Sequence, residues 1–148
     1  MTDRTVEAKE ILELAGNDRL RAFQLVDAQL NVLVLRTQVI LSLSGIVITV
    51  TGFSGRAIAE TSHVAQACIV SGLIVVMLAA AVAVSGVLRL RWLTQVLGSD
   101  ALAMVERMLV LRDAKARSLS VALVLFVIGF SLYVLAVAQL LVATAVTG

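Results

Sequence analysis

Residues 33–56 read LVLRTQVILSLSGIVITVTGFSGR, an apolar run enclosed by two arginines. Between Arg36 and Arg56 lie 19 residues without a charge. As a helix rising about 1.5 Å per residue, these residues would span roughly 29 Å, close to the ~30 Å hydrocarbon core of a bilayer. The run therefore predicts a transmembrane helix over residues 37–55.

Two further uncharged runs follow, and they predict spans over 64–88 and about 118–140. The 148 residues include no proline, which favours long unbroken helices. Only 15% of the residues are charged, against about 25% in soluble domains, and the mean hydropathy is +1.03. We expect an all-α membrane protein without β-sheet, formed by a transmembrane domain over 18–148 and a polar arm or short helix over 1–17.

Helical extensions are predicted on one side of the membrane. Because no breaker occurs between Asp18 and Gly52, the first long helix should begin well before the span, with Gly16–Asp18 as a turn. Residues 89–117 should form a helical hairpin in which Gly98 and Ser99 or Asp100 make the turn. The apolar side chains of this hairpin and of the first extension predict a small water-exposed bundle. We expect a turn over 56–63 on the opposite side.

The distribution of positive charge predicts the orientation. Residues 89–117 contain six of the 12 lysines and arginines, and Arg19, Arg21 and Arg36 precede the first span, whereas the opposite side has only Arg56. Short loops rich in lysine and arginine remain in the cytoplasm. We therefore expect a membrane protein with a cytoplasmic N-terminus, a cytoplasmic 89–117 hairpin and an outer or periplasmic C-terminus.

A polar stripe follows the first long helix at spacings typical of one helix face. It consists of Gln24, Asp27, Asn31, Arg36, Gln38, Ser42 and Thr49. Polar side chains are costly against lipid, so such a face should contact protein or water. The stripe could line a water-filled path between several copies. Alternatively, it could form hydrogen bonds between helices of a single protomer.

Small residues recur at sevens in all three spans and predict close helix packing, since they allow backbones to approach. The candidate packing positions are Gly45, Gly52, Gly72, Ala79, Gly86, Ala122, Gly129 and Ala136.

A basic cluster marks the predicted cytoplasmic hairpin: Arg89, Arg91, Arg112, Lys115 and Arg117. It could bind anionic lipid or a phosphate-bearing ligand. Alternatively, these charges could serve only to set the orientation of the chain.

The sequence offers no pattern for catalysis. It contains one histidine and one cysteine, no glycine-rich phosphate loop, and no acidic residue inside a predicted span. The carboxylates of the N-terminal arm are interpreted as a solvated face. We expect no enzymatic activity, no cofactor, no metal site and no nucleic-acid partner.

The stretch RTQVILSLSGIVITV, with Arg36 just ahead of the span and Gly45 partway into it, resembles bacterial membrane effectors. These are the Pycsar-type and SLATT-type families of anti-phage nucleotide-signalling systems. Their layout of three spans with a cytoplasmic helical extension is also similar. The residues that lead into the span differ, reading Val-Leu-Arg-Thr-Gln in place of the Ala-Asp-x-Lys-Ala type. The resemblance implies an oligomer that perturbs the inner membrane when it is triggered.

Three functions are consistent with the sequence. The first is a small homo-oligomeric inner-membrane protein that acts as a channel-like or membrane-perturbing effector. The second is a non-conducting scaffold or regulatory subunit whose cytoplasmic hairpin docks a cytoplasmic or membrane protein partner. The third is a holin-like lysis protein, although holins usually have a charged C-terminal tail and this chain ends in AVTG. We favour the first.

Overall fold

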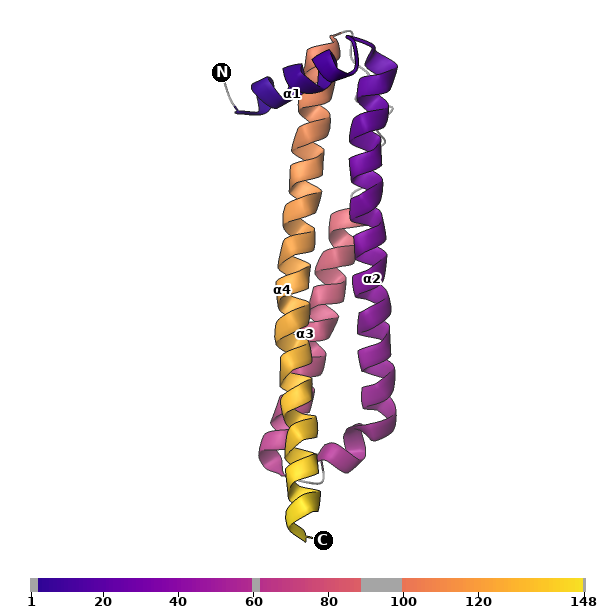
Figure 1. Ribbon diagram of the computed structural model, residues 1–148. Helices are drawn as coiled ribbons and strands as arrows, with labels where there is room; N and C mark the ends of the chain where they lie inside the picture. The colour runs from indigo at the N-terminus through magenta and orange to yellow at the C-terminus, as the bar shows by residue number, and fades with distance from the viewer. Residues whose placement is uncertain (1–2, 60–61, 89–99, 148) are drawn as a thin grey trace.

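The computed structural model describes residues 3–59, 62–88 and 100–147, and this part of the chain is almost entirely helical, without β-strand. It contains α1 (Asp3–Leu14), α2 (Arg19–Ala59), α3 (His63–Leu88) and α4 (Ala101–Thr147). The long helices α2, α3 and α4 run side by side, and α1 lies across one end of the bundle (Figure 1). Each of the three long helices is long and apolar enough to cross a membrane. The predicted all-α class with three candidate spans is confirmed.

The turn between α1 and α2 contains two residues with left-handed backbone. Gly16 has a φ of 65° and Asn17 a φ of 59°. The amides of Gly16 and Asn17 donate to the carbonyls of Glu13 and Leu12, over 2.9 and 2.8 Å, which is the Schellman pattern for ending a helix. Asp18 Oδ1 then accepts from the Leu20 amide and caps α2. The predicted turn at 16–18 and the predicted start of the first long helix agree with this geometry.

The predicted turn over 56–63 is wrong at its start, because α2 continues to Ala59. Residues 57–59 read Ala-Ile-Ala, and Ile58 is buried against Ala65, Ile69 and Ala136. Burial of this isoleucine favours another turn of helix over an earlier loop. Ser62 caps α3 by accepting from the Ala65 amide, and its hydroxyl donates to Gln139 Oε1 on α4 at 3.2 Å.

At the start of α4, Asp100 accepts from the Leu102 amide, as the sequence predicted for one of its two candidate caps. The other candidate, Ser99, and an extension of the second span toward Leu97 lie outside the described residues. From Ala101 onward α4 is one helix, so the second arm of the predicted hairpin and the third span are continuous.

Helices α3 and α4 approach closely through their small residues. A Cβ at Gly72 would lie 2.9 Å from the carbonyl oxygen of Gly129, and a Cβ at Gly129 would lie 2.8 Å from Val76 Cγ2. Further along, Gly86 accommodates Ser118, whose hydroxyl donates to the Val82 carbonyl on α3 at 3.1 Å. The alanines at the same seven-residue spacing are fully buried: Ala65, Ala79, Ala122 and Ala136. The backbones can approach because no side chain separates them.

Helix α2 packs against the other two through a different row of residues. Leu30, Thr37, Ser44, Thr51 and Ile58 are all buried and also recur at sevens. The three hydroxyls donate to the carbonyls four residues earlier, over 2.7 to 2.9 Å. Their hydrogen-bonding capacity is thus used within α2, which lets these small polar side chains face an apolar contact.

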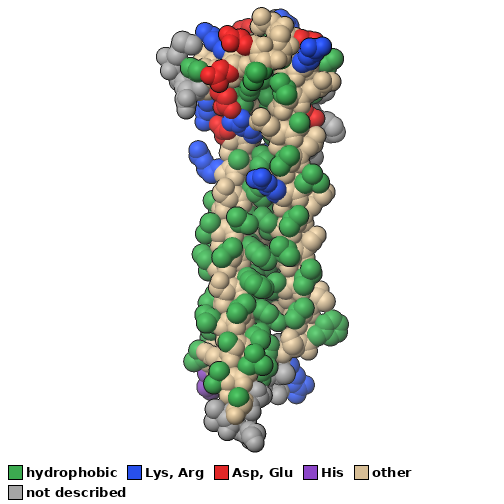
Figure 2. All heavy atoms as spheres, viewed as in Figure 1, with side chains coloured by type: hydrophobic (Ala, Val, Ile, Leu, Met, Phe, Trp, Pro, Cys, Tyr) green, Lys and Arg blue, Asp and Glu red, His purple; other side chains and the backbone are tan. Residues whose placement is uncertain are grey.

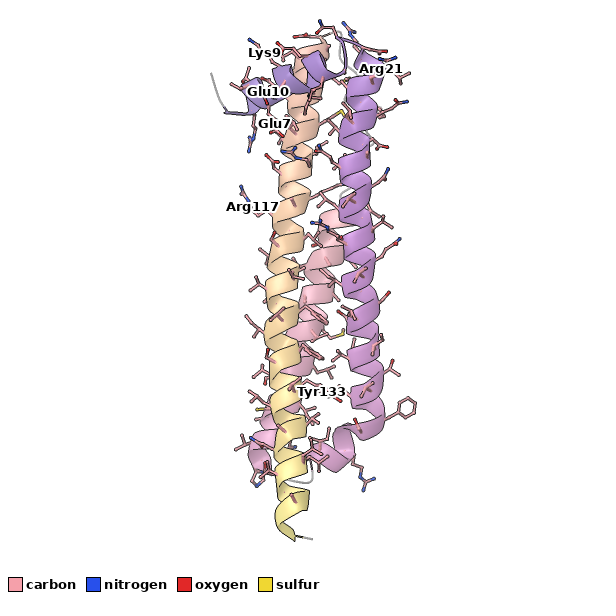
Figure 3. All side chains as sticks on the ribbon, in the orientation of Figure 1. Glu7, Lys9, Glu10, Arg21, Arg117 and Tyr133 are labelled. Atoms are coloured by element: carbon pink, nitrogen blue, oxygen red, sulfur yellow. The ribbon has the colours of Figure 1, made fainter. Side chains whose placement is uncertain are left out.

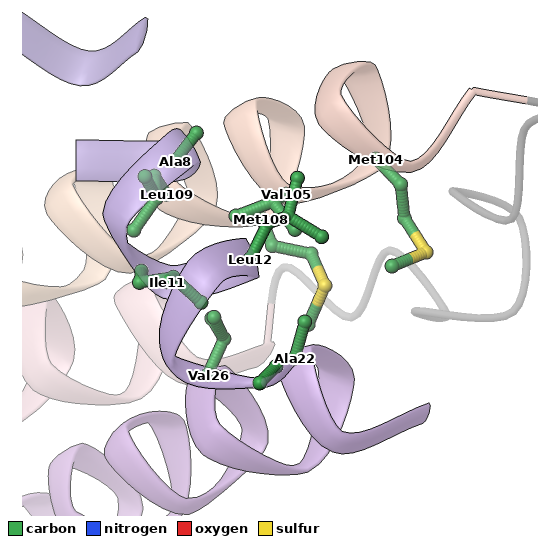
Figure 4. Close-up of a cluster of buried hydrophobic side chains, with 10 residues drawn as sticks. Ala8, Ile11, Leu12, Ala22, Val26, Met104, Val105, Met108 and Leu109 are labelled. Carbon is green, nitrogen blue, oxygen red and sulfur yellow. The ribbon is translucent and has the colours of Figure 1, made fainter. Parts of the chain in front are cut away.

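The end of the bundle that carries α1, here called the head, has its own apolar core (Figure 4). Ile11 and Leu12 of α1 cover Met108 and Leu109 of α4, both of which are fully buried. Helix α2 contributes Ala22 and Val26 to this core. The buried members of this core are Ala8, Ile11, Leu12, Ala15, Ala22, Val26, Met104, Val105, Met108 and Leu109. Residues 3–14 are therefore a docked helix, the second of the two predicted forms of the N-terminal segment.

Candidate functional site

The polar stripe lies on the side of α2 that faces away from α3 and α4. Six of its seven side chains are exposed, and the exception, Asp27, is half-buried and accepts from Asn31 Nδ2 at 3.3 Å. The exposed members are Gln24, Asn31, Arg36, Gln38, Ser42 and Thr49. This exposure fits the prediction of a face open to water or to other copies better than the alternative, a set of hydrogen bonds between helices of one protomer. The side of α2 that faces α3 and α4 is formed instead by the buried row that includes Leu30, Thr37 and Ser44. The two hydroxyls of this row bond within α2, so the row can face an apolar contact.

Gly45 and Gly52 share this outward side and do not pack within the chain. No atom lies within 4 Å of a Cβ built at either position. With Gln24, Asn31 and Gln38 they form a row at sevens, here called the amide row. Gly72 and Gly129 contact a neighbouring helix. Gly45 and Gly52 instead lie on the outer surface of α2, where no side chain projects from them.

An apolar row runs parallel to the amide row, one residue later in the sequence. Its members are exposed large side chains: Leu25, Val32, Val39, Ile46 and Phe53. Between the two rows lie Ala28, Leu35, Ser42 and Thr49, each three residues after a member of the apolar row and four after one of the amide row. The outward face of α2 is thus polar on one flank, mostly small in the middle and apolar on the other flank.

Charged side chains gather on the head (Figure 2). Arg112 of α4 lies at the centre of an ion-pair network and contacts two other helices, α1 and α2. Its Nη1 and Nη2 donate to the two carboxylate oxygens of Glu7 on α1, over 2.6 and 3.2 Å. Nη1 also donates to Gln29 Oε1 on α2 at 3.1 Å.

Asp113 completes the network. It accepts from Arg112 Nη2 at 2.9 Å and lies 3.3 Å from Arg4 Nε on α1. The hydrogen bond to Glu7 raises the pKa of the Arg112 guanidinium, against the opposing effect of burial. Arg112 therefore stays charged and joins α1 to α2 and α4.

The basic cluster predicted from the sequence is only partly assembled as a free surface. Arg112 is engaged with Glu7, Gln29 and Asp113. Lys115 is half-buried, and Arg117 is exposed and projects away from α4 (Figure 3). Arg89 and Arg91 lie outside the described residues. Of the described members, Arg117 is the one most available to a lipid headgroup.

Two features of the structure were missed by the sequence analysis. Glu7 was assigned to a solvated face, whereas it pairs with Arg112. The hydroxyl row of Thr37, Ser44 and Thr51 was overlooked, although its seven-residue spacing, in register with Leu30 and Ile58, could have indicated the inward face of α2.

The described residues contain no group of three or more histidine, cysteine, aspartate or glutamate side chains that could hold a metal ion. The features that remain as candidates for function are the outward face of α2 and the charged head. In comparisons with protein-family models, with curated proteins and with solved structures, nothing matches this chain.

Proposed function

We propose that this chain is a small homo-oligomeric protein of the bacterial inner membrane that acts as a channel-like or membrane-perturbing effector. In this proposal α2, α3 and α4 cross the bilayer. The amide row of α2 faces a water-filled path or polar contact shared by several copies. The resemblance to anti-phage effectors suggests that a signal from outside this chain triggers the activity.

The observation that carries the proposal is the exposure of polar side chains on one face of an apolar helix. Gln38, Ser42 and Thr49 lie within the predicted span 37–55, and all three are exposed in the protomer. Thr49 satisfies its hydroxyl on the Gly45 carbonyl at 2.8 Å, whereas glutamine, as at position 38, is not among the residues that commonly bond back to their own helix. A lone protomer would present this amide to lipid, which is costly. Other copies or water remove that cost.

The charge distribution supports the proposed orientation. The head carries acidic and basic groups, the middle of the bundle is free of charged side chains on the face shown in Figure 2, and Arg56 lies at the other end. With the head in the cytoplasm, this pattern follows the rule that positive residues remain inside. Arg36 and Arg117, each directly before a predicted span, would then lie at the inner headgroup level.

The scaffold alternative is less well supported. It required the apolar face of the cytoplasmic hairpin, residues 89–117, to be open to a partner, and the structure describes residues 100–117 of this hairpin. Val105 and Leu109 of that face are fully buried, and Ile11 and Leu12 of α1 belong to the same core. A partner would first have to displace α1.

The experiment compares two glutamine-to-leucine variants. Gln38 and Gln66 are both exposed, and each lies within two residues of the start of a predicted span. Gln38→Leu on the outward face of α2 should abolish growth arrest on overexpression and ion leakage from proteoliposomes. Gln66→Leu on α3 should leave both unchanged.

Insertion is checked separately by resistance of the protein to alkaline extraction of membranes, because leucine at position 38 should not weaken it. Full leakage from well-inserted Gln38→Leu protein would contradict the proposal. Equal loss in both variants would also contradict it, since the effect would then not belong to α2.

A further inference from the structure

We infer that the apolar row of α2, together with the small residues beside it, is the contact surface for a second copy of this chain, packed parallel along α2. This inference rests on the proposed membrane insertion, but it does not require conduction. It assigns the apolar row to the contact between copies and leaves the amide row beside that contact.

The apolar row continues past the end of the lipid. From Leu25 to Phe53 it extends over 29 residues, a rise of about 42 Å along the helix. Leu25 and Val32 precede the predicted span, yet both side chains are 46% exposed. Lipid would cover Val39, Ile46 and Phe53, but it cannot cover the two residues above the membrane. Only a protein surface that extends from the lipid into the water above the membrane could cover the whole apolar row.

Helix α2 of a second copy fits this requirement. The occupant must present apolar side chains at sevens over four heptads, from the water-exposed head into the lipid. Helix α4 does not offer this surface, because its described segment 101–117 exposes Val110 but no row of large apolar side chains. Copies inserted with one topology bring their α2 helices together in parallel and at equal depth. The same seven-residue spacing then matches along the entire contact.

The middle of the outward face permits close approach. Ala28, Ser42 and Thr49 are small, and Leu35 is the one large side chain of this middle row. At the head, a hollow of about 330 Å³ opens beside Ala28. Leu14, Ala15, Leu25 and Ala28 form most of its wall.

Three arginines lie near this surface. Arg36 is four residues after Val32 and three before Val39, so it flanks the apolar row, and in the proposed orientation it lies at the headgroup level, where lipid phosphates offset its charge. The two arginines in line with the middle row, Arg21 and Arg56, lie beyond the two ends of the span, where water screens them. Arg21 is also 3.8 Å from Asp18, which offsets its charge. Gln24, Asn31 and Gln38 carry both donors and acceptors, so copies can bring these amides near a shared axis without repulsion.

Disulfide cross-linking between copies tests the inference on the full chain in native membrane vesicles. With Cys68→Ala as background, Val39→Cys and Ile46→Cys probe the apolar row. Val121→Cys and Ile128→Cys on α4 are matched controls, because they replace the same residue types, also exposed and seven residues apart, at comparable predicted depth. Leu25→Cys and Val110→Cys, both at positions 46% exposed, form the matching pair above the membrane.

Oxidation with copper-phenanthroline should produce several-fold more dimer at positions 25, 39 and 46 than at positions 110, 121 and 128. A disulfide requires Cβ atoms only about 4 Å apart, so lasting proximity is reported. Equal yields, or an adduct with another protein in place of a dimer, would overturn the inference.

Insertion is measured on the same vesicles by alkaline extraction. Protein that resists extraction but does not cross-link overturns the inference and leaves the membrane proposal intact. Protein that is extracted overturns both. Strong cross-linking without leakage from proteoliposomes supports this contact and overturns the channel-like function alone.

Discussion

Glycine has two roles in the spans, and the space around each residue distinguishes them. Gly72 and Gly129 lie at the contact of α3 and α4, where a Cβ would be 2.9 Å from a backbone carbonyl oxygen of the other helix. Backbone cannot move aside as a flexible side chain can. Gly45 and Gly52 face outward with no atom in reach of a Cβ. Glycine is therefore required for close packing on α3 and α4. On α2, glycines at a similar spacing lie on the outer surface and pack against nothing within the chain.

Alanine substitution should separate these roles. Gly129→Ala should lower the free energy of unfolding in detergent by about 1–3 kcal/mol, because the added methyl group overpacks the contact. Gly45→Ala should leave stability unchanged or raise it by up to about 1 kcal/mol, through better helix propensity. Thermal unfolding of the detergent-solubilised variants measures both. Equal destabilisation by the two substitutions would contradict the assignment of Gly45 to an open face.

Helix α1 is held to the bundle by two kinds of contact. Its apolar side covers Met108 and Leu109, and Glu7 pairs with Arg112 through both carboxylate oxygens. The short turn at Gly16 and Asn17 fixes the direction in which α1 leaves α2. This helix therefore closes the apolar core that α2 and α4 share in the head.

Loss of the Arg112 ion pairs should loosen α1. Arg112→Met removes the hydrogen bonds to Glu7, Gln29 and Asp113 and leaves partly buried acceptors, which should cost about 1–3 kcal/mol. Hydrogen exchange should accelerate in residues 4–15, with little change in α3. Arg117→Met is the control, since Arg117 is exposed and lies on the same helix. Similar exchange in both variants would show that the network does not hold α1.

At the scale of the whole molecule, charge is segregated along the long axis. The described acidic and basic groups concentrate on the head (Figure 2). Arg36 and Arg117 come directly before the predicted spans of α2 and α4, and Arg56 lies in the last turn of α2. The three long helices between them expose mainly aliphatic side chains. This segregation favours one orientation in a membrane.

Reporter fusions test the proposed orientation. A reporter fused after Gly148 should be located outside the cytoplasm. A reporter inserted next to Asp100 should be located inside the cytoplasm. The physical reason is the excess of lysine and arginine around the head, which resists translocation. Both reporters on one side of the membrane would exclude three spans. Protein that stays dispersed in buffer without detergent would exclude membrane insertion.

The sequence was most informative where chemistry acts locally. Uncharged runs predicted the helices, and Gly16, Asp18 and Asp100 predicted turns and caps, because backbone conformation and capping depend on near neighbours. Ile58 shows the limit, since the helix extends around it to bury a side chain against residues from two other helices. Glu7 shows it again, because its partner Arg112 is 105 residues away.

The sequence by itself determined the helical class, the three apolar lengths and the asymmetry of charge, since these follow from composition and from periodicity along one chain. Only the tertiary structure decided which face of each helix is inside. Small residues recur at sevens in all three spans, but the contact of α3 with α4 uses them and the contact of α2 does not. The reason is that periodicity defines a face, whereas the apolar area and shape of the neighbouring helices select which face is buried.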